Sequence, residues 1–267
     1  MTGESEAIPP AEQGLTPLDA SAEIGNLVGR LSGDEKMDRE TRGRLLARLA
    51  RLLGASARQT GAKGLAGGRW LADVFADVAP RIPVRDLETL SRHHDGMLGE
   101  RLADDLVRVA ANATTAVGAA GGALAVVEFA APPLLLTAPA QLVAETLVVS
   151  AIEVKLIAEL HQVYGVQVQG GATTRAAAFT TSWAKQRGIN PLMPGSMAFA
   201  MGTAARTAVR RRLMRTLGRS LTTLGPFFTG ALAGASLNRV ATRKLATSVR
   251  NDLRRHGGYP LPEITEK

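Results

Sequence analysis

Residues 109–127 read VAANATTAVGAAGGALAVV, nineteen positions without a formal charge. Alanine supplies eight of them, and alanine is the strongest helix former among the amino acids. The apolar residues of the whole chain are mostly Ala, Leu and Val, with few aromatic residues, which also favours helix over strand. This stretch therefore predicts a helix at the centre of an all-α helical bundle.

A second uncharged run, residues 129–144, contains three prolines. Proline interrupts a helix because it lacks the backbone N–H and its ring clashes with the preceding turn. A helix then continues to Tyr164, and Gly165 is suited to cap its C-terminal end. We therefore expect an apolar, Ala- and Gly-rich helical hairpin over residues 109–164 that turns at residues 128–133.

Upstream of the hairpin the pattern predicts shorter helices over residues 16–79. Pro17 suits the first position of a helix, and apolar residues recur after it at helical spacing as far as Leu31. A basic amphipathic helix follows, and we expect it to end at Gly54. Residues 1–15 are acidic and contain several glycines and prolines, and they predict a disordered head.

A third uncharged run, residues 221–238, lies near the C-terminal end of the chain. It contains Gly230 and Gly234 four positions apart, the spacing that Gly118 and Gly122 have in the first run. Glycines at this spacing allow two helix backbones to approach closely, in lipid and also in tightly packed soluble bundles. We expect both pairs at helix-packing positions.

The uncharged runs have more than one possible environment. A helix that spans a bilayer needs about 20 apolar residues, a length that the first and third runs barely reach. Alanine gains little from hydrocarbon, so a packed protein core is the rival interpretation, and a hairpin sunk partway into one leaflet is a third. If the hairpin meets a bilayer, Arg101 and Arg108 before it and Lys155 near its end place both ends on the cytoplasmic side.

Two basic amphipathic helices flank the third run. On a helical wheel, four arginines share one face of the first basic helix, and four form a stripe along the second. They are Arg211, Arg212, Arg215 and Arg219, and Arg239, Arg243, Arg250 and Arg254. Such faces attract anionic headgroups, so we expect these eight arginines to bind anionic lipid.

The net charge of +8 is unevenly distributed. Residues 1–40 carry nine acids against three bases, whereas residues 201–267 carry thirteen bases against three acids. The C-terminal part therefore suits a polyanionic partner. Nucleic acid is disfavoured because no aromatic residue is interleaved with the arginines to stack on bases. The acidic start does not resemble a secretory signal, so we expect the N-terminus to stay in the cytoplasm.

Few residues suggest chemistry. The chain has no cysteine, so disulfides, thiolate metal sites and a cysteine nucleophile are excluded. The four histidines lack metal-binding spacing, and no phosphate-binding loop or nucleophile motif is present, so we expect no catalytic, metal or cofactor site. Glu128, Glu145 and Glu153 are acids within apolar sequence. Each of these carboxylates is expected either to face solvent or to pair with a cation, and the basic helices could supply that cation. The alternative is that they form a polar relay inside the apolar helices.

Seven short stretches follow one another in a recognisable order. They are RIPVRD at 81–86, ETL at 145–147, IEVKLIAELH at 152–161, VYG at 163–165, LGPFF at 224–228, GALAG at 230–234 and NRVATRKL at 238–245. In this order they resemble a family of uncharacterised actinobacterial membrane-associated proteins and, more distantly, the EcsC family. The resemblance covers about residues 80–255 and implies a helical domain in or beside the cytoplasmic membrane. It brings no reaction with it.

These patterns predict a non-enzymatic protein on the cytoplasmic face of the cytoplasmic membrane, which binds the bilayer or inserts into it. In this interpretation residues 80–255 form the main helical domain and residues 256–267 a tail. The alternative is a soluble helical protein that binds a partner protein or a polyanion.

Overall fold

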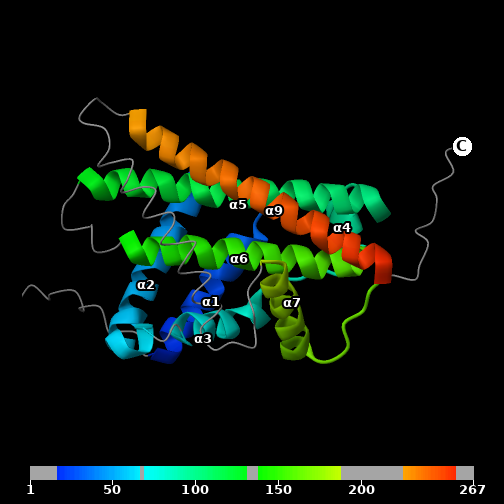
Figure 1. Cartoon of the computed structure of the whole chain (residues 1–267), viewed down its shortest axis with the longest axis horizontal. Helices are drawn as coiled ribbons and strands as arrows, with labels where there is room; N and C mark the ends of the chain where they lie inside the picture. The colour runs from blue at the N-terminus through cyan, green and yellow to red at the C-terminus, as the bar shows by residue number, and fades with distance from the viewer. Residues whose placement is uncertain (1–16, 67–68, 131–137, 188–224, 257–267) are drawn as a thin grey trace, which may run out of the picture.

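Figure 1 shows the computed structural model of the chain, which describes residues 17–66, 69–130, 138–187 and 225–256. The regular structure in these ranges is helical, and they contain no strand. The predicted all-α class is therefore confirmed. The predicted disordered head, residues 1–15, lies outside the described ranges.

The described helices follow one another with short connections. In chain order they are α1 Pro17–Gly33, α2 Arg39–Ala66, α3 Arg69–Val78, the short 3-10 helix η1 Ala79–Arg81, α4 Leu87–His93, α5 Gly99–Ala130, α6 Ala138–Val163, α7 Ala172–Gln186 and α9 Gly225–His256. α7 was not anticipated. α9 joins part of the third uncharged run and the second basic helix into one continuous helix.

The helix α2 corrects one predicted boundary, because it runs through Gly54 to Ala66. A glycine inside a helix costs only about 1 kcal/mol, which packing on both sides of it can outweigh. A methyl group added at Gly54 would touch the side chain of Ala140 on α6 at 3.4 Å. Gly54 therefore lies at a close contact between two helices rather than at a helix end.

The predicted hairpin is present as α5 and α6, which lie side by side and run in opposite directions (Figure 1). α5 extends to Ala130, beyond the expected start of the turn at residue 128. The connection, residues 131–137, lies outside the described ranges. Among the described helices, none combines the length and the apolar character needed to cross a membrane.

The helix α6 forms the centre of the molecule. It contacts α1, α2, α4, α5, α7 and α9, and each of the residues 151–160 is buried. A helix that is apolar on all sides is typical of one that is covered on all sides. The apolar character of α6 therefore fits a protein core. Lys155, expected near a membrane edge, is only 5% exposed and belongs to this core.

The C-terminal end of α6 has the cap that the sequence predicted. Gly165 has a φ of 67°, in the left-handed region that glycine adopts without strain. Its N–H donates to the Gln162 carbonyl at 3.2 Å, and the Val166 N–H donates to the His161 carbonyl at 3.0 Å. This ending places Tyr164 against the start of α5, where its hydroxyl donates to Glu100.

Candidate functional site

The helix α9 lies along α5 (Figure 1) and buries one side against the bundle. From residue 235 onward, where its side chains are described, the buried residues of α9 are Ala235, Thr242, Leu245, Ala246, Val249 and Leu253. The opposite side exposes Leu237 by 54% and Val240 by 64%. Arg243 and Lys244 are exposed on the next turn. Residues three and four apart share one side of a helix, so these four side chains form one patch, which we call the α9 surface.

At the other end of α9, two of the predicted lipid-binding arginines are engaged within the protein. Arg254 donates to both carboxylate oxygens of Glu100, at 2.9 and 2.6 Å, and Arg250 donates to Glu100 and, at 2.6 Å, to Asp104. The hydrogen bond from Arg254, supported by those from Arg250 and Tyr164, lowers the pKa of Glu100 to about 2. The carboxylate therefore stays ionised and offsets the charge of the arginines that contact it.

The eight arginines predicted to bind lipid are thus not equivalent. Arg250 and Arg254 form internal ion pairs, Arg239 donates to the neutral Asn112 side chain at 2.5 Å, and Arg243 is exposed. The remaining four lie outside the described residues: Arg211, Arg212, Arg215 and Arg219.

The sequence also carries a broader signal than its arginine clusters, which is a long stretch without acidic residues. Between Glu159 and Asp252 the sequence has ninety-two residues with thirteen Lys or Arg and no Asp or Glu. The described part of this stretch contains α7 and most of α9, and it exposes Arg175, Lys185, Arg243 and Lys244. A surface with one sign of charge raises the local concentration of anions.

Glu153 is fully buried, and four donors surround its carboxylate. Trp183 Nε1 donates at 2.9 Å, Thr242 Oγ1 at 2.8 Å, and Arg187 donates from Nε at 3.1 Å and from Nη2. The expectation that Glu153 meets a cation is confirmed. Arg187 follows the end of α7, however, and does not come from the two basic helices. Trp183 also stacks on Phe75 of α3, with ring centroids 5.8 Å apart.

Glu145 is half-buried and accepts a hydrogen bond from Gln141 at 3.2 Å. Its carboxylate lies over Gly121 of α5, where an added methyl group would approach Oε1 to 1.8 Å. Gly118, one of the predicted packing glycines, instead lies against α9, with Ala235 as its nearest backbone neighbour. Glu128 and Gly122 belong to α5, and Gly230 and Gly234 to α9, but their surroundings lie outside the described part of the structure.

A second ionic cluster, in which Lys155 and Glu159 are buried and Glu35 and Arg85 half-buried, was not predicted. Lys155 Nζ lies 2.8 Å from Glu159 Oε2 on the same helix and 3.5 Å from Glu35 Oε1, and Arg85 contacts the same Glu35 oxygen at 2.8 Å. Burial raises the pKa of Glu159. Burial acts in the same sense on Glu35, but the Arg85 hydrogen bond and the Lys155 charge outweigh it and lower the pKa of Glu35. The cluster joins the α1–α2 connection, α6 and the segment before α4.

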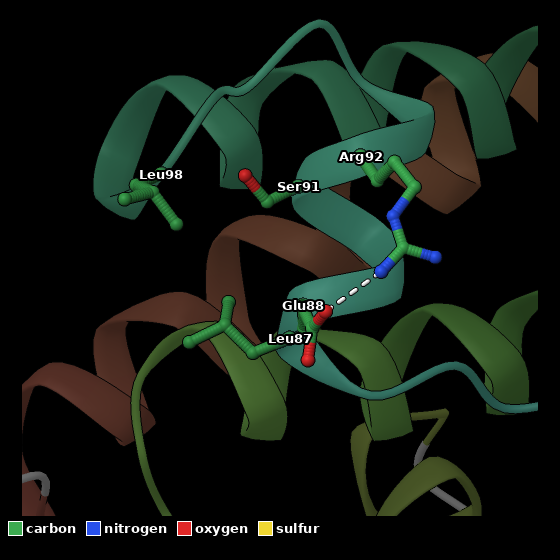
Figure 2. Close-up of a pocket in the computed structure, with 5 residues that line it drawn as sticks. All are labelled: Leu87, Glu88, Ser91, Arg92 and Leu98. Carbon is green, nitrogen blue, oxygen red and sulfur yellow. Dashed lines mark hydrogen bonds and ion pairs between the residues drawn. The ribbon is translucent and has the colours of Figure 1, made fainter.

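An open hollow of about 580 Å³ lies beside α4 (Figure 2). Leu87, Glu88, Ser91 and Arg92 of α4 line it together with Leu98, the residue before α5. Leu87 is 36% exposed and Leu98 46% exposed. Glu88 and Arg92 are paired at 2.7 Å.

The chain turns sharply between the two leucines of this hollow. Asp95 and Gly96 have φ values of 53° and 76°, and the Gly96 N–H donates to the Ser91 carbonyl at 2.8 Å. This left-handed pair reverses the chain after α4, so that Leu98 lines the hollow across from Leu87 (Figure 2).

The described residues contain no group of histidines and acids that could hold a metal ion. Comparison of the chain with protein-family models, curated proteins and solved structures finds no match. The resemblance to a family of actinobacterial membrane-associated proteins and, more distantly, to the EcsC family therefore rests on the sequence stretches alone. The features of the fold that offer a functional role are the α9 surface, the hollow beside α4 and the two ionic clusters.

Proposed function

We propose that this protein binds anionic membrane surfaces on the cytoplasmic side as a peripheral protein, through the α9 surface. The supporting observation is the exposure of Leu237 and Val240 on the same side of α9 as Arg243 and Lys244. An interfacial helix buries apolar side chains at the headgroup boundary and places cations among the headgroups. Each basic residue near an anionic surface contributes about 1 kcal/mol.

Two further features favour a surface interaction over insertion of the hairpin. Residues 151–160 of α6 are all buried, so to enter a bilayer the helix would have to leave contacts with α1, α2 and α7. It also carries Glu153, Lys155 and Glu159, whose partners lie on other segments or within the helix itself. A charge that loses its partner in hydrocarbon is costly. The α9 surface, by contrast, is accessible in the folded protein.

The test is co-sedimentation with vesicles of phosphatidylcholine alone or mixed with phosphatidylglycerol. The double variant Arg243→Gln/Lys244→Gln should bind the anionic vesicles at least about tenfold more weakly, because two cations contribute about 2 kcal/mol. Arg44→Gln/Arg48→Gln, the same change of charge on α2, is the control and should bind almost normally. Replacing Leu237 and Val240 by serine should weaken binding without changing the net charge.

If the α2 control and the α9 variant lost affinity for anionic vesicles equally, the assignment of the α9 surface would be contradicted. Binding that is equally strong to neutral vesicles would contradict an electrostatic contribution. Binding to a soluble polyanion such as heparin with no binding to vesicles would favour the alternative class, a soluble protein with a polyanionic partner.

A further inference from the structure

A small cavity lies where α1, α5 and α6 meet. The space in it that a water molecule can reach is about 20 Å³. Apolar residues of α5 and α6 form part of its lining, and four polar residues form the rest: Ser32, Glu35, Lys155 and Glu159. The lining includes no residue of the α9 surface, so membrane binding as proposed above does not use this cavity.

One buried oxygen atom of this lining lacks a hydrogen-bond partner. Glu159 is only 2% exposed, and its Oε2 accepts a hydrogen bond from Lys155 Nζ at 2.8 Å. Its Oε1 has no partner among the described residues. A buried carboxylate oxygen without a partner is costly. Protonation does not remove the cost, because an O–H group at Oε1 needs an acceptor in turn. Oε1 therefore needs a hydrogen-bond donor that is small enough for the cavity.

The size and the charge of the cavity determine which donor fits. One water molecule needs about 10–15 Å³ of such space, so the cavity has room for one water and for nothing much larger. The carboxylates of Glu35 and Glu159 are already balanced by Lys155 and by Arg85, which contacts Glu35 at 2.8 Å. A metal cation would add an unbalanced positive charge beside Lys155. A neutral donor satisfies Oε1 without that cost.

We propose that this cavity is a binding site for one internal water molecule, which donates a hydrogen bond to Glu159 Oε1. Lys155 Nζ has three N–H groups and pairs with Glu159 and Glu35, so the third can donate to the water. Ser32 Oγ donates to the Gly29 carbonyl at 3.3 Å, which leaves its lone pairs to accept the second hydrogen of the water. Three partners are typical of an internal water. The water thus links α1 to α6, and this inference does not depend on membrane binding.

The relaxation dispersion of water oxygen-17 counts the long-lived internal waters of a protein in solution, and it tests the proposal on the full-length chain. Ala110 lines the cavity, so the two methyl groups added by Ala110→Val should displace the water and lower the count by one. The matched control is Ala116→Val, the same change at a half-buried position of α5 outside the cavity lining, and it should leave the count unchanged. Circular dichroism checks that both variants are folded.

A high-resolution crystal structure of the unaltered protein gives a second test that needs no variant. One water should lie about 2.7–3.0 Å from Glu159 Oε1, with Lys155 Nζ and Ser32 Oγ as its other partners. A dry cavity, a metal ion at Oε1 or a protein atom bonded to Oε1 would each overturn the proposal. An unchanged count in folded Ala110→Val, or an equal loss in Ala116→Val, would overturn it as well.

Discussion

Glu153 has a buried charge whose partner comes from a distant part of the chain. Periodicity and composition indicate that an acid in apolar sequence needs a cation, but they do not identify the cation. The partner, Arg187, is 34 residues away and lies just beyond a helix that the sequence analysis did not anticipate. Lys155 and Glu159 contact each other four residues apart, a spacing that can be recognised in sequence, yet their burial depends on the packing of α1 against α6.

Removal of Arg187 should be costlier than removal of both charges. Arg187→Met leaves the buried Glu153 carboxylate with only the neutral donors Trp183 and Thr242, and should lower the free energy of unfolding by about 3 kcal/mol. The double variant Glu153→Gln/Arg187→Met should regain at least about 1 kcal/mol of this, because an amide is cheaper to bury than an unpaired charge. Urea unfolding followed by circular dichroism at 222 nm measures both values.

The single variant Glu153→Gln completes the thermodynamic cycle. If Arg187→Met and the double variant proved equally stable, the carboxylate would not depend on Arg187. Such a result would mean that Trp183 and Thr242 suffice to stabilise its charge.

At the scale of helices, hydrophobic pattern and glycine spacing predict which elements form better than which elements touch. The hairpin of α5 and α6 follows from two apolar runs separated by prolines, and the structure has it. Glycine spacing also predicts Gly118 at a helix-packing position. Its neighbour is α9, however, and the glycine that lies beside α6 is Gly121. A helix exposes several sides, and only the tertiary arrangement determines which neighbour each side meets.

Two glycine-to-alanine changes should have opposite effects on stability. Gly43 in α2 has open space around it, so Gly43→Ala should raise the free energy of unfolding by about 0.5–1 kcal/mol through helix propensity and a less flexible unfolded chain. At Gly118 an added methyl group would approach the Asn238 amide to 2.9 Å and the Ala235 backbone to 3.2 Å. In Gly118→Ala this steric conflict should outweigh the gain in helix propensity and lower the free energy of unfolding by about 1 kcal/mol or more. Thermal unfolding of the pair side by side distinguishes them, and a stabilising Gly118→Ala would contradict a close contact of α5 with α9.

At the scale of the whole molecule, the apolar sequence and the basic sequence have separate roles. α6 supplies the centre of the core, where ten consecutive residues are buried, while exposed cations lie on the outer helices, among them α2, α5, α7 and α9. Composition alone left a membrane hairpin and a protein core as alternatives for the same residues, because both environments select for alanine, leucine and valine. The difference between them is whether other helices cover the apolar surface, and that depends on contacts between segments far apart in sequence.

This arrangement makes a prediction about hydrogen exchange. Amides of residues 147–160 in α6 should exchange most slowly among the described helices, because opening them requires separation from α1, α2, α5 and α7. When phosphatidylglycerol vesicles are added, peripheral binding should slow exchange in residues 236–247 of α9 and leave α6 unchanged. Insertion of the hairpin would instead detach α6 from its neighbours, so α1 and α2 would exchange faster. Mass spectrometry of peptides from α1, α6 and α9, with neutral vesicles as the control, separates these two responses. Faster exchange in α1 and α2 on anionic vesicles would show that the protein opens on the membrane. Peripheral binding through the α9 surface would then be contradicted as the final bound state.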